Sequence, residues 1–262
     1  MKIYQVDSFT DRAFGGNPAG VCILQGPADE KWMQDIAMEM NLAETAFLYK
    51  KDDDIYDLRW FTPEEEEDLC GHATLASAHI LWEKGVLEPD RKAVFKTRSG
   101  ILSAVKKDGA IEMDFPSEAP TDTTAPEILD RALSVPFLYV GRNRLDYIVE
   151  VENEETVRRL EPEYNLLKKL DARGVVVTSR SGSPEYDFVS RFFAPVAGIN
   201  EDPVTGSTHC CLAPYWGKKL GKLSMNAYQA SKRGGAMRVT VNGDRVLLAG
   251  QAVTVFSIEV NC

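Results

Sequence analysis

The chain contains RWFTPEEEEDLCGHATLASAHILW, from Arg59 to Trp82, and much later SRFFAPVAGINEDPVTGSTHCCLAPYW, from Ser190 to Trp216. Each stretch runs from an arginine through an aromatic pair and a proline into an acidic loop. It then reaches a glycine, Gly71 or Gly206, that begins a helix rich in small residues. Solenoid repeats recur every ~20–50 residues, whereas these copies lie farther apart. The pattern predicts a duplicated domain with one site shared between the halves.

The helix after Gly71 has no polar stripe. Its apolar residues point in nearly all directions, and no charge appears before Glu83. We therefore expect the helix to be buried. Its first-turn N–H groups lack intrahelical partners and carry partial positive charge, which suits a small carboxylate or a developing enolate. Small residues would also let a sheet pack closely around the helix, and the two interpretations are compatible.

A proline-rich stretch divides the chain. PSEAPTDTTAPE, residues 116–127, has no apolar periodicity, which is typical of a linker. We expect an N-terminal domain over residues 1–118 and a C-terminal domain over residues 119–251, each made of strands, a central helix and further strands. The last strand, within residues 252–262, could return to the first domain's sheet, and the sequence leaves this open.

Local patterns predict the individual elements. Asp29 is a candidate N-cap for a helix that runs to about Met40. Short apolar runs predict the strands Lys2–Phe9, Ala19–Leu24, Ala43–Tyr49, Tyr56–Phe61, Ala93–Thr97, Leu102–Lys106, Ile111–Phe115, Gly174–Ser179, Tyr186–Phe193, Met237–Val241, Val246–Ala249 and Val253–Val260. They also predict a strand or hairpin over Phe137–Val151 and short helices near Glu154–Leu160 and Glu163–Leu170.

The composition is that of an ordinary soluble protein, with 44% hydrophobic and 27% charged residues. A net charge of −10 argues against nucleic acid or an anionic membrane as a partner. No apolar run approaches the ~18–20 residues of a membrane span, and the N-terminus has a strand pattern rather than that of a signal peptide. Five cysteines form no paired framework and indicate a reducing compartment. We expect a cytoplasmic protein.

Four motifs in order carry a family resemblance: VDSF…GNPAGV (Val6–Val21), NLAETAF (Asn41–Phe47), RWFTP followed by DLCGHATLASA, and EDPVTGSTHCCLAPYW. Over essentially all 262 residues the chain resembles the phenazine-biosynthesis F-like (PhzF-like) family, relatives of diaminopimelate epimerase and proline racemase. The resemblance implies an α+β fold of two pseudo-symmetric domains, each wrapping a mixed sheet around a central helix. It also implies cofactor-independent isomerisation of a small carboxylate-bearing molecule in the cleft between them. A homodimer is the default expectation for such an enzyme.

Glu44 is the first candidate catalytic residue. Strand alternation places it on one face with Ala46 and Leu48, while the other face is also apolar. Desolvation in such a strand favours the protonated carboxyl, which suits proton transfer. The family resemblance gives the matching glutamate the role of an acid/base that moves a proton between carbons. The alternative is a junction residue that reaches solvent or bonds a helix end.

The resemblance also assigns site roles around both helix starts. His72 would hold the substrate carboxylate or relay a proton, and Asp202 would orient polar groups of the substrate. Ser207 would offer a hydroxyl and an N–H, with Gly71 and Gly206 at the helix starts beside these residues. Asn17 is a further substrate-contact candidate. Each residue also has a structural alternative: His72 as a helix-start histidine bonded to the preceding loop, Asp202 as a capping aspartate and Asn17 as a turn residue. His209 could align a substrate or pack in the core, and we favour the core.

The cysteines separate two mechanisms. Diaminopimelate epimerase-type racemases place a thiol before each helix-opening glycine, on opposite faces of the substrate. Cys70 occupies the first position here, but Thr205 occupies the second and is too weak an acid. We therefore expect chemistry by one base, Glu44. The helix N-terminus would lower the pKa of Cys70, which makes it a possible reactive thiol.

Other sites are not indicated. His72 and His79 lie seven residues apart and His209 is adjacent to Cys210, so no metal-ligand spacing appears and we expect no metal. No Rossmann or P-loop pattern occurs, and we expect no cofactor. The sequence thus predicts an isomerase. The rivals are a racemase or epimerase of an amino or hydroxy acid that uses Cys70 and Glu44, and a non-catalytic small-molecule binding protein.

Overall fold

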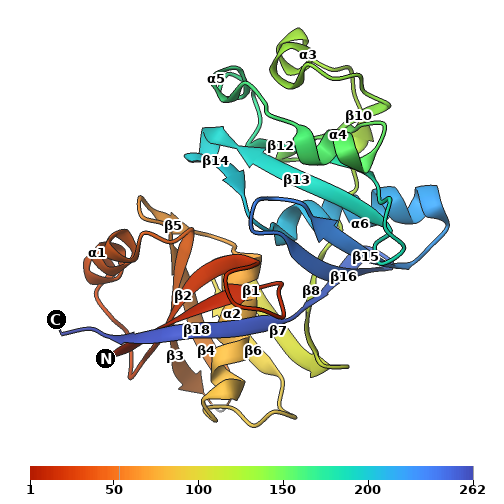
Figure 1. Ribbon diagram of the computed structural model, residues 1–262. Coiled ribbons are helices and arrows are strands. Elements are labelled where there is room, and N and C mark those ends of the chain that lie inside the picture. The colour runs from red at the N-terminus through yellow and green to blue at the C-terminus, as the bar shows by residue number, and fades with distance from the viewer. Residues whose placement is uncertain (53, 262) are drawn as a thin grey trace. The chain divides into compact units, whose positions relative to one another are not determined.

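The computed structural model describes residues 1–52 and 54–261 (Figure 1). Contacts divide the chain into two compact units, unit 1 (Met1–Phe115 with Ala249–Cys262) and unit 2 (Pro116–Leu248). The last strand, β18 (Ala252–Glu259), lies in unit 1 and pairs antiparallel with β1 (Lys2–Ser8). None of the helices in the described ranges is long and apolar enough to cross a membrane.

Unit 1 combines a mixed sheet with two helices in its described residues. Besides β1 and β18, its elements are β2 (Asn17–Leu24), α1 (Glu30–Met40), β3 (Glu44–Asp52), β4 (Ile55–Phe61), β5 (Glu66–Glu67), α2 (Gly71–Glu83), β6 (Ala93–Thr97), β7 (Gly100–Lys107) and β8 (Ala110–Pro116). The strand order is β18-β1-β2-β3-β4-β6-β7-β8, and β5 pairs with β4. The β2–β3 and β4–β6 pairs are parallel, and the others are antiparallel.

α2 is the buried centre of unit 1. Every residue from His72 to Ala78 is buried, as are Ile80, Leu81 and Trp82. The helix contacts β1, β2, β3 and β18, so the sheet wraps around it. Because α2 carries apolar or small residues on all sides, it can be surrounded without burying an unpaired charge. The burial predicted from the absence of a polar stripe is confirmed.

Unit 2 repeats this arrangement. Its elements are β9 (Thr121–Asp122), α3 (Glu127–Leu133), β10 (Tyr139–Arg142), β11 (Asp146–Glu150), α4 (Glu154–Arg159), α5 (Tyr164–Leu167), β12 (Gly174–Arg180), β13 (Phe188–Ala194), the 3₁₀ turn η1 (Pro195–Ala197), β14 (Ile199–Asp202), α6 (Gly206–Leu220), β15 (Ser224–Gln229), β16 (Gly235–Asn242) and β17 (Arg245–Gly250). β9-β10-β11-β12-β13-β15-β16 lie side by side, and β14 pairs with β13.

The two units share one pattern of strand pairing. In unit 1 the run β2-β3-β4-β6-β7 alternates parallel, antiparallel, parallel, antiparallel. In unit 2 the run β11-β12-β13-β15-β16 alternates in the same order. In chain order, α2 follows the short strand β5 just as α6 follows β14. The sequence repeat therefore corresponds to a duplicated topology, and the predicted α+β class is confirmed.

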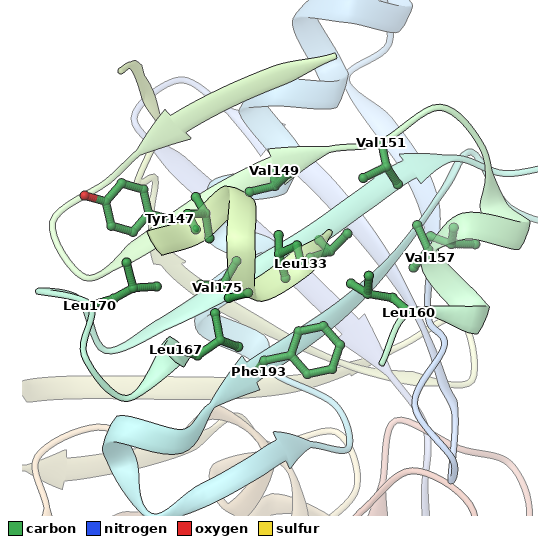
Figure 2. Close-up of a cluster of buried hydrophobic side chains, with 14 residues drawn as sticks. Leu133, Tyr147, Val149, Val151, Val157, Leu160, Leu167, Leu170, Val175 and Phe193 are labelled. Carbon is green, nitrogen blue, oxygen red and sulfur yellow. The ribbon is translucent and has the colours of Figure 1, made fainter. Parts of the chain in front are cut away.

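The outer faces of the two sheets differ in how they are covered. In unit 2, helices α3, α4 and α5 bury a large cluster against β11, β12 and β13, which includes Val149, Val175 and Phe193 (Figure 2). In unit 1, α1 alone buries a smaller cluster around Met33 and Phe47. Among the described residues, one helix packs on this face of unit 1, compared with three in unit 2.

Most of the local predictions are confirmed. Asp29 caps α1 by accepting a hydrogen bond from the Trp32 N–H at 3.0 Å, and Phe137–Val151 contains the hairpin β10–β11. The sequence analysis missed α3, which begins where we expected the linker to end, and β15. It also missed the short strands β5, β9 and β14, which lie in stretches interpreted as loops or linker. β15 buries Met225, Ala227 and Gln229 on one face, and the polar Gln229 obscured the apolar alternation.

Candidate active site

The starts of β2 and β3 bring Asn17 and Glu44 to the start of α2. Asn17 is opposite Ser8 in the β1–β2 pair, and Glu44 is opposite Ala19 in the β2–β3 pair. Gly16 makes the tight approach possible: its φ is +60°, and a Cβ atom there would lie 2.0 Å from the Ser8 carbonyl oxygen. Only glycine fits this position.

His72 lies among the other candidate residues of unit 1. Its Nε2 is 3.2 Å from Glu44 Oε2, and its Nδ1 is 3.3 Å from Asn17 Nδ2 and 3.5 Å from Cys70 Sγ. The Ser8 hydroxyl donates to the His72 carbonyl at 2.8 Å, which fixes this turn of α2. The His72 side chain is 7% exposed and that of Glu44 is 19% exposed. The structure thus places Asn17, Glu44, Cys70, Gly71 and His72 in one cluster.

The charge of His72 depends on its neighbours. Burial lowers its pKa, but the Glu44 carboxylate, together with the hydrogen-bond contact to Cys70, outweighs burial and holds the pKa above its ordinary value. The Asn17 amide is placed with its nitrogen toward Nδ1, which fits a neutral ring with the proton on Nε2, facing Glu44. An imidazolium would need the Asn17 amide turned over. The protonation state of His72 is therefore coupled to the orientation of the Asn17 amide.

The expected low pKa of Cys70 is wrong. Burial raises the pKa of this thiol to about 11, and the Glu44 charge adds to the effect. Cys70 is the N-cap of α2 and only 5% exposed. Desolvation destabilises the thiolate more than the helix N-terminus stabilises it, because the partial charge of a helix end is small and acts over one turn. Cys70 is therefore a neutral thiol at neutral pH.

The same residues form a possible metal-ligand set. One atom each of Glu44, Cys70 and His72 lie within 4.8 Å of one another. Carboxylate, thiolate and imidazole are all zinc ligands. Sequence spacing did not indicate this set, because Glu44 comes from β3 while the other two flank Gly71. The absence of a metal stays a prediction, which metal analysis of the purified protein and chelator treatment would test.

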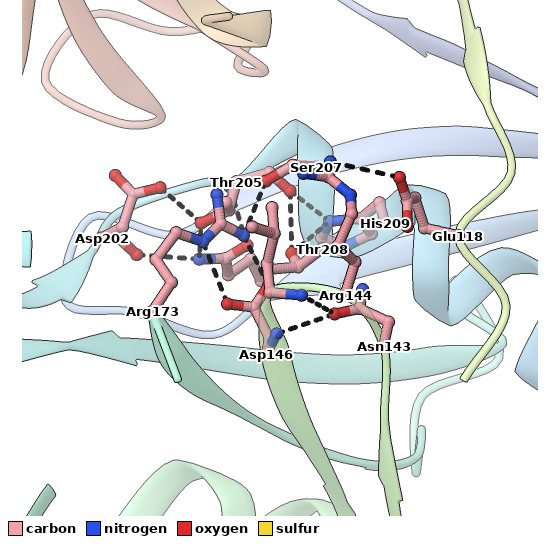
Figure 3. A network of polar contacts seen from close by, with 12 residues as sticks. Glu118, Asn143, Arg144, Asp146, Arg173, Asp202, Thr205, Ser207, Thr208 and His209 are labelled. Carbon is pink, nitrogen blue, oxygen red and sulfur yellow. Dashed lines mark hydrogen bonds and ion pairs between the residues drawn. The ribbon is translucent and has the colours of Figure 1, made fainter. Parts of the chain in front are cut away.

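The start of α6 carries a second polar cluster, in unit 2 (Figure 3). The Thr205 hydroxyl donates to Asp202 Oδ2, and the Thr205 N–H donates to Gln229 Oε1 at 2.9 Å. Gln229 Nε2 donates back to the Asp202 carbonyl at 2.8 Å. Asp202 is 8% exposed, and Gly206 and Ser207 follow at once as the first residues of α6. The three residues predicted for this half lie together.

Arg173 and Asp146 complete this cluster and were missed by the sequence analysis. Arg173 Nη2 donates to Ser207 Oγ at 3.0 Å and pairs with Asp146, whose side chain is 1% exposed. Burial raises the pKa of Asp146, and Arg173 opposes that rise. The Arg173 guanidinium also lies 5.1 Å from the centre of the Phe192 ring. Neither residue belongs to a motif, so no sequence signal could have found them.

His209 is a core residue, as we favoured. It is fully buried, stacks on Phe188 with ring centres 6.0 Å apart, and its Nδ1 lies 2.8 Å from the Thr205 carbonyl oxygen. Burial lowers the pKa of His209 to about 4. Its ring is thus neutral at physiological pH.

Comparison with known proteins defines the class. The family model described as "Phenazine biosynthesis-like protein" matches residues 6–258. An uncharacterized isomerase of Halalkalibacterium halodurans is 55% identical over 258 residues, which cover 98% of this chain and 97% of that protein. The crystal structure of a PhzF-family phenazine biosynthesis protein from Enterococcus faecalis has a TM-score of 0.95 and 41% identity, covering 100% of this chain and 99% of that one.

A more distant structure shows the fold alone. A probable proline racemase from Agrobacterium radiobacter K84 has a TM-score of 0.65 and 12% identity, covering 99% of this chain and 92% of that chain. The chain belongs to the phenazine biosynthesis-like protein family, within the proline racemase-like fold, and it is an isomerase.

Proposed function

We propose that the protein is a cofactor-independent isomerase that moves a proton between two carbons of a small carboxylate-bearing molecule, with Glu44 as the acid/base. One observation carries the proposal: a largely buried carboxylate lies 3.2 Å from an imidazole nitrogen at the start of a buried helix. A carboxylate held in this way can accept a proton and return it, and neighbouring donors can stabilise the anion formed in between.

The proton path follows from the contacts. Glu44 takes a proton from a carbon activated by a carboxylate or by conjugation, which leaves a delocalised anion on the substrate. His72 Nε2 lies 3.2 Å from the Glu44 carboxylate, and Asn17 Nδ2 lies 3.3 Å from Nδ1 at the opposite edge of the imidazole. The glutamic acid then protonates a different carbon of the same substrate. With Glu44 as the single acid/base, both transfers take place on one face of the substrate.

The geometry disfavours the racemase alternative. Inversion needs two acids on opposite sides of one carbon, each roughly 3–3.5 Å away, so their reacting atoms must be roughly 6–7 Å apart. Cys70 Sγ and the Glu44 carboxylate oxygen lie within 4.8 Å of each other. In addition, the Cys70 thiol has a pKa of about 11 and is a weak proton donor.

Asp202 and Ser207 are proposed to bind polar groups of the substrate. Asp202 is fixed through Thr205, and Ser207 accepts from Arg173, which orients its hydroxyl proton outward from that contact. In this role they contribute binding and orientation rather than proton transfer.

The test is isotope exchange. The purified protein would be incubated in deuterated water with a panel of amino acids, hydroxy acids and cyclic dienoic acids, and NMR would follow both deuterium incorporation and new isomers. Wild type, Glu44→Gln and Glu39→Gln would be compared. Glu39 is exposed on α1 and provides the same chemical change away from the site.

We expect wild type and Glu39→Gln to act alike on one class of the panel, and Glu44→Gln to be slower by about 10²–10⁴-fold, the usual contribution of a general acid/base. Activity that survives in Glu44→Gln would remove the central assignment and point to His72 or Cys70. Inversion of a stereocentre without a new isomer would favour the racemase. Binding of a panel member without any chemistry in wild type would favour the non-catalytic binding protein.

A further inference from the structure

Unit 1 contains a cavity on the sheet face opposite Glu44. Along β3, Phe47 and Tyr49 alternate with Glu44, Ala46 and Leu48, so they lie on the other face. Phe47 belongs to the cluster that α1 covers. The cavity has a volume of about 290 Å³ and is lined by both of these aromatic residues. It is therefore separate from the site around Glu44 and His72.

The cavity lies where α1 leaves the outer face uncovered. Its apolar side is formed by Leu24, Pro27, Ala28, Met33 and Phe47. Unit 2 covers its corresponding face with three helices, whereas unit 1 has a single helix of 11 residues there. The space left over is small, since binding sites for drug-sized ligands begin near 300 Å³. A ligand with one ring matches this size.

Comparison with unit 2 identifies, among the described residues, a hydrogen-bond donor without a partner on the polar side of the cavity. Arg59 of β4 and Arg191 of β13 hold matching positions: each ion-pairs with a glutamate and lies about 5 Å from a phenylalanine ring two residues on. Nη1 of Arg191 donates to three carbonyl oxygens at the end of α4, the nearest at 2.6 Å. Arg59 uses its Nε and Nη2 on Glu66 and Glu30. Among the described residues, its Nη1 has no acceptor.

Two further cations line the same side. Lys96 is cross-strand to Asp57 and exposed, and it has no carboxylate within 4.0 Å in the described part of the chain. Asp57 already accepts from Tyr49 at 2.6 Å and pairs with Lys51 at 3.2 Å. Arg98 also lines the cavity and pairs with Glu66. The polar side thus offers donors at Arg59 Nη1 and Lys96 but no spare carboxylate.

We propose that this cavity is a second ligand site, which binds a small aromatic monocarboxylate. The ring lies against Leu24, Ala28 and Tyr49, the lining residues that keep accessible apolar or aromatic surface, where ring–ring contact with Tyr49 is favourable. The carboxylate accepts from Arg59 Nη1 and from Lys96, and so takes the place that the α4 carbonyls fill in unit 2. Charge-assisted hydrogen bonds of this kind fix the orientation of the acid.

The probe is benzoate, titrated into ¹⁵N-labelled full-length protein, with benzamide as the uncharged isostere. Lys96→Glu reverses the charge at the polar side, and Lys50→Glu makes the same change on the opposite face of β3. Ala28→Phe fills the apolar side. Circular dichroism and the thermal midpoint of each variant show whether it is folded. Glu44→Gln is included to separate this cavity from the candidate active site.

Benzoate should bind saturably and shift amides of residues 24–28, 47–49 and 96–98. Lys96→Glu and the change to benzamide should each weaken binding about tenfold or more, the effect of losing one charge-assisted contact. Lys50→Glu and Glu44→Gln should leave binding within about twofold, as is usual for a distant surface charge. No saturable binding, equal binding of benzamide, or shifts centred on Glu44 and His72 would overturn the proposal. Equal binding to folded Ala28→Phe would also do so.

Discussion

The starts of α2 and α6 have nearly the same backbone and different chemistry. Their N-cap residues, Cys70 (φ −135°, ψ 113°) and Thr205 (φ −117°, ψ 109°), are both extended, and neither caps the helix through its side chain. A threonine hydroxyl in each first turn bonds back to the N-cap carbonyl, Thr74 to Cys70 and Thr208 to Thr205. The duplication has therefore preserved the frame at both helix starts.

The side chains at this frame differ in their charge balance. Glu44 faces His72, and within the described residues no arginine or lysine lies within 4.0 Å of it. Asp146 is paired with Arg173, which also holds Ser207. A carboxylate beside an imidazole can exchange protons, whereas one bound to an always-charged guanidinium cannot readily do so. We therefore propose that acid/base chemistry takes place at the α2 start and fixed polar binding at the α6 start.

The largest expected effect tests this division directly. Glu44→Gln should lower the rate of isomerisation by about 10²–10⁴-fold. Ser207→Ala should lower it by about tenfold or less, because Ser207 contributes one hydrogen bond to binding. Rates with the substrate found in the isotope-exchange panel provide the measurement. Equal losses in the two variants would contradict the division of roles.

The next effect concerns the two buried histidines, whose pKa values shift in opposite directions. The pKa of His209 falls from 6.5 to about 4, so the unfolded chain takes up this proton first as pH falls. Stability from a neutral His209 is complete above pH 6.5 and is lost on acidification toward pH 4, by about 3 kcal/mol. His72, with its raised pKa, contributes the opposite trend: its stabilisation is present at low pH and is lost as pH rises.

Urea unfolding of wild type and His209→Phe between pH 4 and 7 checks this. A phenylalanine can keep the stacking on Phe188, and the Thr205 carbonyl still accepts from Thr208 at 2.9 Å. The free energy of unfolding of the variant should fall less between pH 7 and pH 4 than that of wild type. Identical pH profiles would show that His209 is not the group responsible.

A smaller effect is expected at the ion pair of unit 2. Asp146→Asn leaves the Arg173 guanidinium without its charge partner, and should cost about 1–3 kcal/mol of unfolding free energy. This is below the cost for a fully buried pair, because the Arg173 side chain is 31% exposed. Asp171→Asn is the matched control, since the Asp171 side chain is fully exposed in its pair with Arg142, and no measurable change is expected. Equal unfolding midpoints for both variants would rule out a stabilising pair at Asp146.

The smallest effect is expected at the N-cap of α2. Cys70→Ser should change the isomerisation rate by about threefold or less, because the thiol is neutral and takes no part in the proposed proton path. The rate and the stereochemistry of the product would both be measured. A large loss, or a loss of stereoinversion, would instead support the two-acid mechanism.

Some features of the fold and the candidate site could be predicted from local sequence patterns, and others could not. The repeat, the buried helices and the Asp29 cap were evident from periodicity and composition, and the family resemblance pointed to Glu44 and His72 as candidate site residues. The raised pKa of Cys70 was not evident, because it depends on how much water the folded protein removes from the thiol. Gln229 was likewise missed, since a buried amide is satisfied only by the Asp202 and Thr205 groups that the fold brings to it.

The sequence by itself determined the duplicated architecture, because apolar patterning and turn residues act over a few neighbouring positions and survive in both copies. Tertiary structure alone decided the Arg173–Asp146 pair, the Glu44–Cys70–His72 cluster and the cavity beside α1. These depend on which strands become neighbours and on how many helices cover each face. Hydrogen bonds, desolvation and open volume are set by distances between residues far apart in the chain, which no local pattern encodes.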